Sequence, residues 1–99
     1  MDRASLVMLV RFKTALPIEQ AKQITKERMP QFRALEGLTQ KFYLIDESAG
    51  EVAGLYFWRS EDDLAEFKES ELRASIPGAY QIVGEPRVEV YKVFDELRE

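Results

Sequence analysis

GLTQKFYLIDESAGEVAGLYFWRS, residues 37–60, carries the strongest structural pattern in this chain. Two runs rich in aromatic and β-branched residues, 39–45 and 52–58, flank a polar loop that contains Gly50. Such runs around a short polar loop predict two antiparallel strands joined as a hairpin. Successive side chains of a strand point to opposite faces, so this hairpin has two faces of different chemistry.

The two faces of the predicted hairpin differ in the polarity of their side chains. One face holds ordinary core residues: Phe42, Leu44, Leu55 and Phe57. The other holds an amine and three aromatic rings with polar atoms: Lys41, Tyr43, Tyr56 and Trp58. We expect helices of the same domain to cover the first face. A partner subunit and a ligand are expected to cover the second, because a soluble monomer rarely exposes so much aromatic surface.

A first helix is predicted to begin at Pro17, since proline suits the first helical turn. Its buried stripe recurs at spacings of three and four: Ile18, Ala21, Ile24, Arg28, Phe32 and Leu35. Pro30 removes a helical hydrogen bond, so we expect a kink or break near Met29. Gly37 is predicted to end the helix as a left-handed cap.

A second helix is predicted after the hairpin, with Ser60 as its cap and acidic residues in its first turn. A break is expected around Ser70, and Pro77-Gly78 is expected to stop the helix. Strands are predicted at both ends of the chain, over residues 5–13 and 87–94. The first of these is apolar on both faces, as in the centre of a covered sheet.

The resulting order, β-α-β-β-α-β, predicts one α+β domain over residues 1–99 with the ferredoxin-like arrangement. Its four-stranded antiparallel sheet has helices on one face. The open face is expected to gather six side chains: Lys41, Tyr43, Tyr56, Trp58, Glu89 and Tyr91. Because this patch is large and aromatic, we expect a homodimer that stacks sheet on sheet.

The composition excludes several kinds of active site. The chain has no Cys, His or Asn, which excludes disulfides, thiolate nucleophiles, serine-type triads, His-ligated haem and ordinary zinc sites. The three carboxylates of loop 46–51 lack the alternate spacing of a calcium loop, so we expect a solvated turn and no metal.

The charge distribution also limits the partners. Net charge is −4 and no basic stripe is present, which disfavours nucleic acid and anionic membranes. The apolar run 6–10 is too short for a signal peptide or a membrane span, so the expected location is the cytoplasm.

Short motifs spread along the chain resemble one family. They are Gly37-Leu38 with Lys41 and Tyr43, then Gly54, Tyr56 and Trp58, then Ser70-Glu71, and finally Pro86 with Val88-Glu89. They resemble the small mono-oxygenases of the dimeric α/β-barrel superfamily, which includes antibiotic-biosynthesis mono-oxygenases. The resemblance implies a homodimer whose sheets form a shared barrel, with a pocket between sheet and helices in each subunit. The missing Asn and His depart from the quinol-forming and haem-degrading members, so the full catalytic set is not carried over.

The resemblance implies oxidation of a small aromatic or enolic molecule by O₂ without a cofactor. That chemistry needs a base, a donor that stabilises the anion and a water-poor pocket. Lys41 is the expected donor, and either Glu71 or Glu89 is the expected base. The expected substrate-binding residues are Tyr43, Tyr56, Trp58 and Tyr80.

Each of these residues also has a structural interpretation. Trp58 and Tyr56 could pack at the dimer interface, Lys41 could pair with Glu89 across strands, and Tyr80 could cover the pocket mouth. The alternative function is a non-catalytic homodimer that binds a small apolar or aromatic ligand or serves as an accessory subunit. A purely structural dimer and an RNA-binding relative are further alternatives, and the second is disfavoured by the acidic chain.

Overall fold

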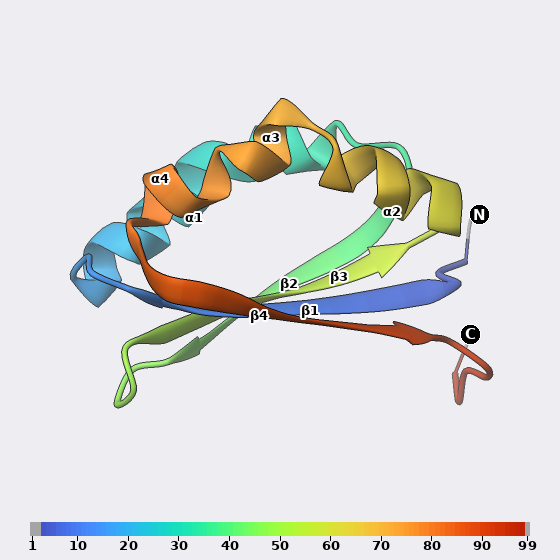
Figure 1. The fold of residues 1–99 in the computed structure, drawn as a ribbon. Helices are drawn as coiled ribbons and strands as arrows, with labels where there is room; N and C mark the ends of the chain where they lie inside the picture. The colour runs from blue at the N-terminus through green and yellow to red at the C-terminus, as the bar shows by residue number, and fades with distance from the viewer. Residues whose placement is uncertain (1–2, 99) are drawn as a thin grey trace.

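The computed structural model describes residues 3–98, which form a sheet with helices on one side (Figure 1). The strands are β1 (Leu6–Thr14), β2 (Leu38–Asp46), β3 (Glu51–Trp58) and β4 (Ile82–Lys92). The helices are α1 (Ile18–Arg33), α2 (Glu61–Lys68), α3 (Glu71–Ala74) and α4 (Ile76–Tyr80). All four helices lie over the same face of the sheet, and the described residues leave the other face uncovered.

The sheet has the strand order β2-β3-β1-β4, and every neighbouring pair is antiparallel. β1 is central, as its two apolar faces indicate. The order along the chain is β-α-β-β-α-β, with the second helical segment divided into α2, α3 and α4. The predicted ferredoxin-like α+β fold is therefore confirmed.

β4 is longer than the sequence pattern indicates. It begins at Ile82, so residues expected to form a connection belong to the strand. Gly84 adopts a φ of 73°, and the pairing with β1 shifts its register between Arg11 and Lys13. This irregularity lets the strand continue past a glycine and a proline that would interrupt a regular ladder.

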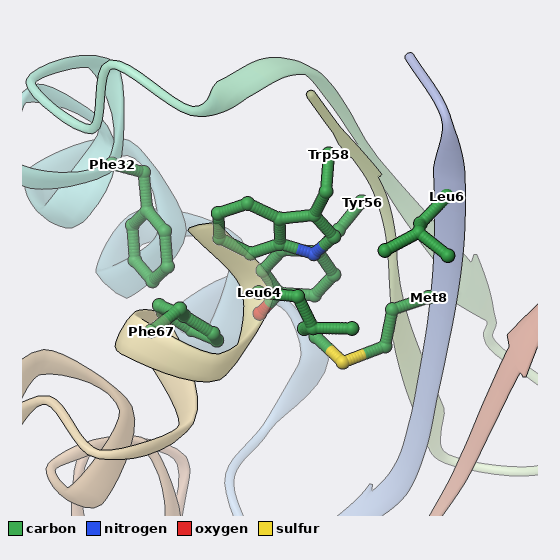
Figure 2. Close-up of a cluster of buried hydrophobic side chains, with 7 residues drawn as sticks. All are labelled: Leu6, Met8, Phe32, Tyr56, Trp58, Leu64 and Phe67. Carbon is green, nitrogen blue, oxygen red and sulfur yellow. The ribbon is translucent and has the colours of Figure 1, made fainter. Parts of the chain in front are cut away.

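Seven buried side chains fill the space between the sheet and the helices (Figure 2). They are Leu6, Met8, Phe32, Tyr56, Trp58, Leu64 and Phe67. Trp58 is only 1% exposed, and its ring stacks on that of Tyr56 with 6.0 Å between centroids and 8° between planes. Phe67 of α2 packs on both rings, at 5.1 Å from Trp58 and 5.5 Å from Tyr56. The helices therefore cover the aromatic face of the hairpin.

The predicted assignment of the hairpin's two faces is wrong. The side chains expected on the open face lie on the helix side: Lys41, Tyr43, Tyr56 and Trp58. Those expected in the core lie on the uncovered side: Phe42, Leu44, Leu55 and Phe57. Alternation separates the faces of a strand but does not tell which face the helices cover. The choice is made by Phe32 and Phe67, whose rings pack on the aromatic face.

The uncovered face is apolar, although most of its residues are not the expected ones. Its apolar side chains include Val7, Leu9, Phe42, Leu44, Leu55, Phe57 and Tyr91, and the paired charges of Arg11 and Glu89 lie beside them. Phe42 is 51% exposed and Tyr91 61% exposed. Of the aromatic residues predicted for this face, Tyr91 is the one that the structure places there.

A kink or break was predicted near Met29, and α1 continues through Pro30 without a break. The proline interrupts the ladder locally, and its own carbonyl accepts from the backbone N–H of Ala34 at 3.2 Å. The helix ends at Arg33, so Gly37 is not its left-handed cap. Glycine is needed at position 37 for another reason, because a Cβ there would collide with the side chain of Asp63.

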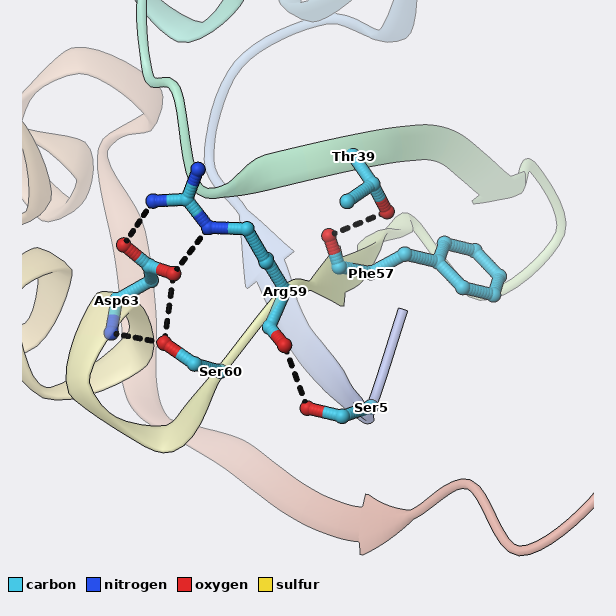
Figure 3. Close-up of polar contacts among 6 residues, drawn as sticks. All are labelled: Ser5, Thr39, Phe57, Arg59, Ser60 and Asp63. Carbon is cyan, nitrogen blue, oxygen red and sulfur yellow. Dashed lines mark hydrogen bonds and ion pairs between the residues drawn. The ribbon is translucent and has the colours of Figure 1, made fainter. Parts of the chain in front are cut away.

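Ser60 caps α2 as predicted (Figure 3). Its Oγ accepts from the backbone N–H of Asp63 at 3.2 Å and donates to the Asp63 carboxylate at 2.7 Å. Arg59 holds the same carboxylate through two contacts of 3.0 Å. At the neighbouring strand end, the Thr39 hydroxyl donates to the carbonyl of Phe57 at 3.1 Å. The junction between β3 and α2 is thus fixed by side chains near each other in sequence and in space.

The break predicted near Ser70 is confirmed, since Ser70 caps α3 by accepting from the backbone N–H of Arg73 at 3.1 Å. The helix stop predicted at Pro77-Gly78 is wrong, because both residues lie inside α4. Proline is tolerated there because it occupies the start of the helix. The chain turns instead at Gln81, whose φ is 47°.

Candidate functional site

The amine of Lys41 lies in a cage of three aromatic rings beneath the helices. Its Nζ is 3.6 Å from the ring centroid of Phe32 on α1, 4.2 Å from Tyr56 on β3 and 4.4 Å from Tyr43 on β2. Within residues 3–98 the amine has no hydrogen-bond acceptor and no carboxylate partner. Ring faces therefore take the place of a counter-ion.

Gly54 makes the close approach of Lys41 and Tyr56 feasible. It lies opposite Tyr43 in the β2–β3 ladder. A Cβ at this position would lie 2.9 Å from Cε1 of Tyr56 and 3.2 Å from Cε of Lys41. Any larger residue would push these two side chains apart, so the glycine is part of the site's geometry.

Burial lowers the pKa of Lys41 from 10.5 to about 7, and the positive charge of Arg28 acts in the same direction. The ring faces attract the ammonium form, but desolvation prevails. An amine with this pKa is present in both protonation states near neutral pH. It can therefore accept a proton and, once charged, stabilise an anion.

The hydroxyls of Tyr56 and Tyr43 stay protonated near neutral pH. Burial raises the pKa of both Tyr56 and Tyr43. Within the described part of the chain the Tyr56 hydroxyl has no hydrogen-bond partner, whereas that of Tyr80 shares a bond of 2.6 Å with Thr25. The Tyr56 hydroxyl is thus available to a ligand, and the Tyr80 hydroxyl is engaged with α1.

Tyr56 lines two small cavities between the sheet and the helices. One has a volume of about 20 Å³, and its polar lining consists of Lys41, Tyr43, Tyr56 and Tyr80. The other has a volume of about 70 Å³ and is lined largely by apolar side chains that include Met8, Phe67 and Val88. The charged residues that line this second cavity are Lys68 and Arg73, and no Asp or Glu lines it. Val10 and Ile76 line both cavities together with Tyr56.

The structure brings together four of the predicted site residues, namely Lys41, Tyr43, Tyr56 and Tyr80. Tyr80 is buried at the cavity wall, against Phe12 at 5.3 Å between centroids, and does not cover a mouth. Trp58 stacks behind Tyr56 and lines neither cavity. Its Nε1 is buried without a hydrogen-bond partner in the described residues.

The two carboxylates predicted as candidate bases lie away from these cavities. Glu89 is on the uncovered face of β4, where it contacts Arg11 at 3.4 Å and accepts a 2.8 Å bond from the Tyr91 hydroxyl. The predicted pair of Lys41 and Glu89 is therefore wrong, since β2 and β4 are opposite edges of the sheet. Glu71 is exposed in the first turn of α3.

Sequence reasoning missed the site roles of Phe32, Arg28, Gly54 and Thr25. Phe32 and Arg28 both lie in the helical stripe that the spacing identifies, so their burial beside the sheet was foreseeable. Gly54 stands inside a strand pattern, which signals close approach of another group. Thr25 gives no comparable signal.

No group of three or more acidic side chains within residues 3–98 is placed to hold a metal ion. No helix in that range is long and apolar enough to cross a membrane.

Solved structures share this fold along nearly the whole chain. No protein-family model and no curated protein sequence matches the sequence of this chain. A protein of unknown function from Nitrosomonas europaea has 16% identity and a TM-score of 0.74, with coverage of 100% of this chain and 98% of that one. SnoaB, a cofactor-independent oxygenase from Streptomyces nogalater, has 10% identity and a TM-score of 0.76, with coverage of 97% and 99%.

An antibiotic biosynthesis mono-oxygenase has 10% identity and a TM-score of 0.71, with coverage of 91% of this chain and 99% of that one. Likeness at these identities is a statement about the fold. The chain therefore has the fold shared by antibiotic-biosynthesis mono-oxygenases.

Proposed function

We propose that this chain is a cofactor-independent mono-oxygenase acting on a small phenolic or enolic molecule. The observation that carries the proposal is the Lys41 amine, whose pKa is lowered to about 7 inside a cage of rings. Lys41 lines a small, largely apolar cavity, and Tyr56 is shared between that cavity and a second apolar one. The fold shared with SnoaB, a cofactor-independent oxygenase, supports the same reaction class.

In the proposed reaction the neutral Lys41 amine removes the acidic proton of a phenol or enol. The resulting anion is electron-rich enough to donate electrons to O₂, and the Lys41 ammonium and the Tyr56 hydroxyl stabilise it. A CH₂ carbon of the substrate becomes C=O and supplies all four electrons that O₂ accepts. One oxygen atom stays in the carbonyl, and the other leaves as water with the two hydrogens of that carbon.

Oxygen uptake by metal-free protein with anthrone-like substrates, which carry the reacting CH₂ carbon, tests this proposal. Replacing Lys41 by Met should lower turnover by about a hundredfold or more, the contribution expected of a general base. The matched control is Lys22→Met, which removes an exposed amine of α1 and should leave turnover unchanged. Turnover in the native chain should rise as the pH passes about 7, where Lys41 loses its proton.

Unchanged turnover in Lys41→Met would contradict the assigned role of that amine. The alternative, a non-catalytic binding protein, makes a different prediction: saturable heat of binding for such molecules in calorimetry with no oxygen uptake. The small cavities and the distance of Glu71 and Glu89 from them favour this alternative if uptake is absent.

We further propose that a second copy of the chain covers the bare face of the sheet. That face is apolar, and Phe42 and Phe57 pack edge to face on it at 5.9 Å between centroids. Its charges include the internal pair of Arg11 and Glu89, so two such faces can meet although each chain has a net charge of −4. Stacking the faces would remove the exposed aromatic patch.

Sedimentation at micromolar concentration tests the dimer. Phe42→Asp should shift the chain to a monomer, because the two-fold contact would then bury a charge. Phe94→Asp is the control, since Phe94 is 99% exposed and lies beyond β4. A native chain that sediments as a monomer would refute this arrangement and leave the oxygenase proposal to its own test.

A further inference from the structure

Lys41 also lines a larger cavity, one to which Tyr56 does not contribute. This cavity has a volume of about 320 Å³ and lies between the end of α1 and the start of β2, the edge strand of the sheet. Phe32 and Tyr43, two of the rings that cage the amine, belong to its wall. The amine is therefore reachable from an opening large enough for a small organic molecule.

The charged groups of this cavity are both basic. Arg33, in the last turn of α1, lines it together with Lys41, and no Asp or Glu does. Within residues 3–98 neither of these two side chains has a carboxylate partner. Thr39 and Gln40 add uncharged polar groups. In a chain with a net charge of −4, such a cavity suits a small anion.

We propose that Lys41 is a carbonyl-reactive amine that forms an imine with a small aldehyde or ketone bearing a carboxylate, such as a 2-oxo acid. Arg33 binds the carboxylate, for which its planar guanidinium is well suited. This second activity uses the amine of the proposed oxygenase site but needs no oxygen chemistry.

The reaction balances without an oxidant or a reductant. The lone pair of the neutral Lys41 nitrogen attacks the carbonyl carbon, and the C=O π electrons move to oxygen. A proton then passes from nitrogen to that oxygen to give a carbinolamine. The carbinolamine loses its hydroxyl with a proton as water, and a C=N bond replaces the C–O bond. Phe32, Tyr43 and Tyr56 surround the nitrogen with ring faces, which contribute no group that competes with it for the carbonyl.

Lys22 provides an internal comparison in the same chain. It is exposed on α1, and its Nζ contacts the carboxylates of Glu47 at 3.3 Å and Glu19 at 3.5 Å. These contacts raise the pKa of Lys22, the bond to Glu47 being the first cause. Its amine is therefore protonated near neutral pH and lacks the lone pair that attack requires.

The test is reductive trapping under argon with glyoxylate and cyanoborohydride near neutral pH. Cyanoborohydride converts an imine to a stable secondary amine, and peptide mass spectrometry locates it. Lys41 should be modified at least about tenfold faster than Lys22, because far more of it is neutral. Unfolding the chain in urea should abolish that difference. Equal rates at the two lysines in the folded chain would overturn the proposal.

Arg33→Gln tests the carboxylate part of the proposal. Arg33 is exposed, so the variant should fold. Trapping of glyoxylate at Lys41 should slow severalfold in this variant, while trapping of propanal, which has no carboxylate, should not change. Equal slowing of both reagents, or of neither, would overturn the role of Arg33. The absence of oxygen makes these outcomes independent of whether the chain is an oxygenase.

Discussion

The two faces of the sheet differ in what covers them. The helix side buries aromatic rings that have polar ends, with Tyr56 3% and Trp58 1% exposed. The bare side holds plain apolar residues such as Phe42 and Leu44, which stay exposed in a single subunit. The chain's own helices therefore cover the first face, and the polar groups buried there line cavities in which they can act on a ligand. The second face can be covered only by association with another chain.

The largest contrast is expected from removing a phenylalanine on each side of the sheet. Phe67→Ala should lower the free energy of unfolding by about 3–5 kcal/mol, because it opens a cavity among buried rings. Phe42→Ala should cost less than about 1 kcal/mol at concentrations where the chain is monomeric. Urea titrations measure both values, and equal losses would erase the distinction between the faces.

The buried amine should make the helix side sensitive to pH. Lys41 faces Tyr43 of β2 and Tyr56 of β3, whose own pKa values are raised by burial, and the positive charge of Arg28 on α1 helps to lower the pKa of Lys41. Its pKa is lower in the folded chain, so the unfolded chain binds the extra proton between about pH 7 and 10.5. Stability therefore rises with pH across that window, and the cost of the buried charge is complete below it.

Lys41→Met should accordingly stabilise the chain by on the order of 2 kcal/mol at about pH 6, and by less at about pH 9. The comparison variant is Lys22→Met, which lacks this stabilisation because the native Lys22 amine is exposed. Urea unfolding at the two pH values gives the measurement. A stabilisation that grew with pH would show that the Lys41 amine is not destabilised by burial.

A smaller effect is expected from filling the space over Gly54. Gly54→Ala should cost about 1–2 kcal/mol, since its Cβ would press on Tyr56 and Lys41. Gly78→Ala is the control, because a Cβ there meets nothing within 4 Å and alanine favours the helix. Thermal unfolding of the two variants should move in opposite directions, and a shift of the same sign in both would contradict the close approach.

The smallest effect concerns the hydroxyl pair on the helix side. Thr25→Val and Tyr80→Phe each remove the 2.6 Å bond between α1 and α4, and each should cost about 1 kcal/mol. The double variant should cost less than the sum of the two, because both remove the same bond. Additive losses in urea unfolding would mean that the hydroxyls contribute separately.

Much of the architecture could be predicted because it depends on local patterns. The hairpin, the central strand, the Ser60 cap and the break at Ser70 all follow from residue type and spacing. The errors arose where one sequence pattern is compatible with two different structures. Pro77-Gly78 was expected to stop a helix but lies inside α4. Of the kink or break expected near Met29, the break is absent, because α1 continues through Pro30.

The candidate site was predictable in its members more than in its position. Lys41, Tyr43 and Tyr56 do meet, together with Tyr80, but beneath the helices instead of on the open face where the first three were expected. Alternation in one chain fixes which side chains share a face, and tertiary packing fixes what covers it. The contacts of Glu89 depend on β4 lying beside β1, a pairing distant in sequence that no local pattern reveals.

Trp58 is the single tryptophan of the chain, and it is held against Tyr56 and Phe67 in the interior. Its indole emission should therefore be blue-shifted in the native fold and move to the red when the interior is hydrated. Because Tyr56 touches both the indole and the cavities, occupancy of the site should alter the emission intensity without that red shift. The protein thus contains a built-in optical reporter that separates ligand occupancy from unfolding in a single titration.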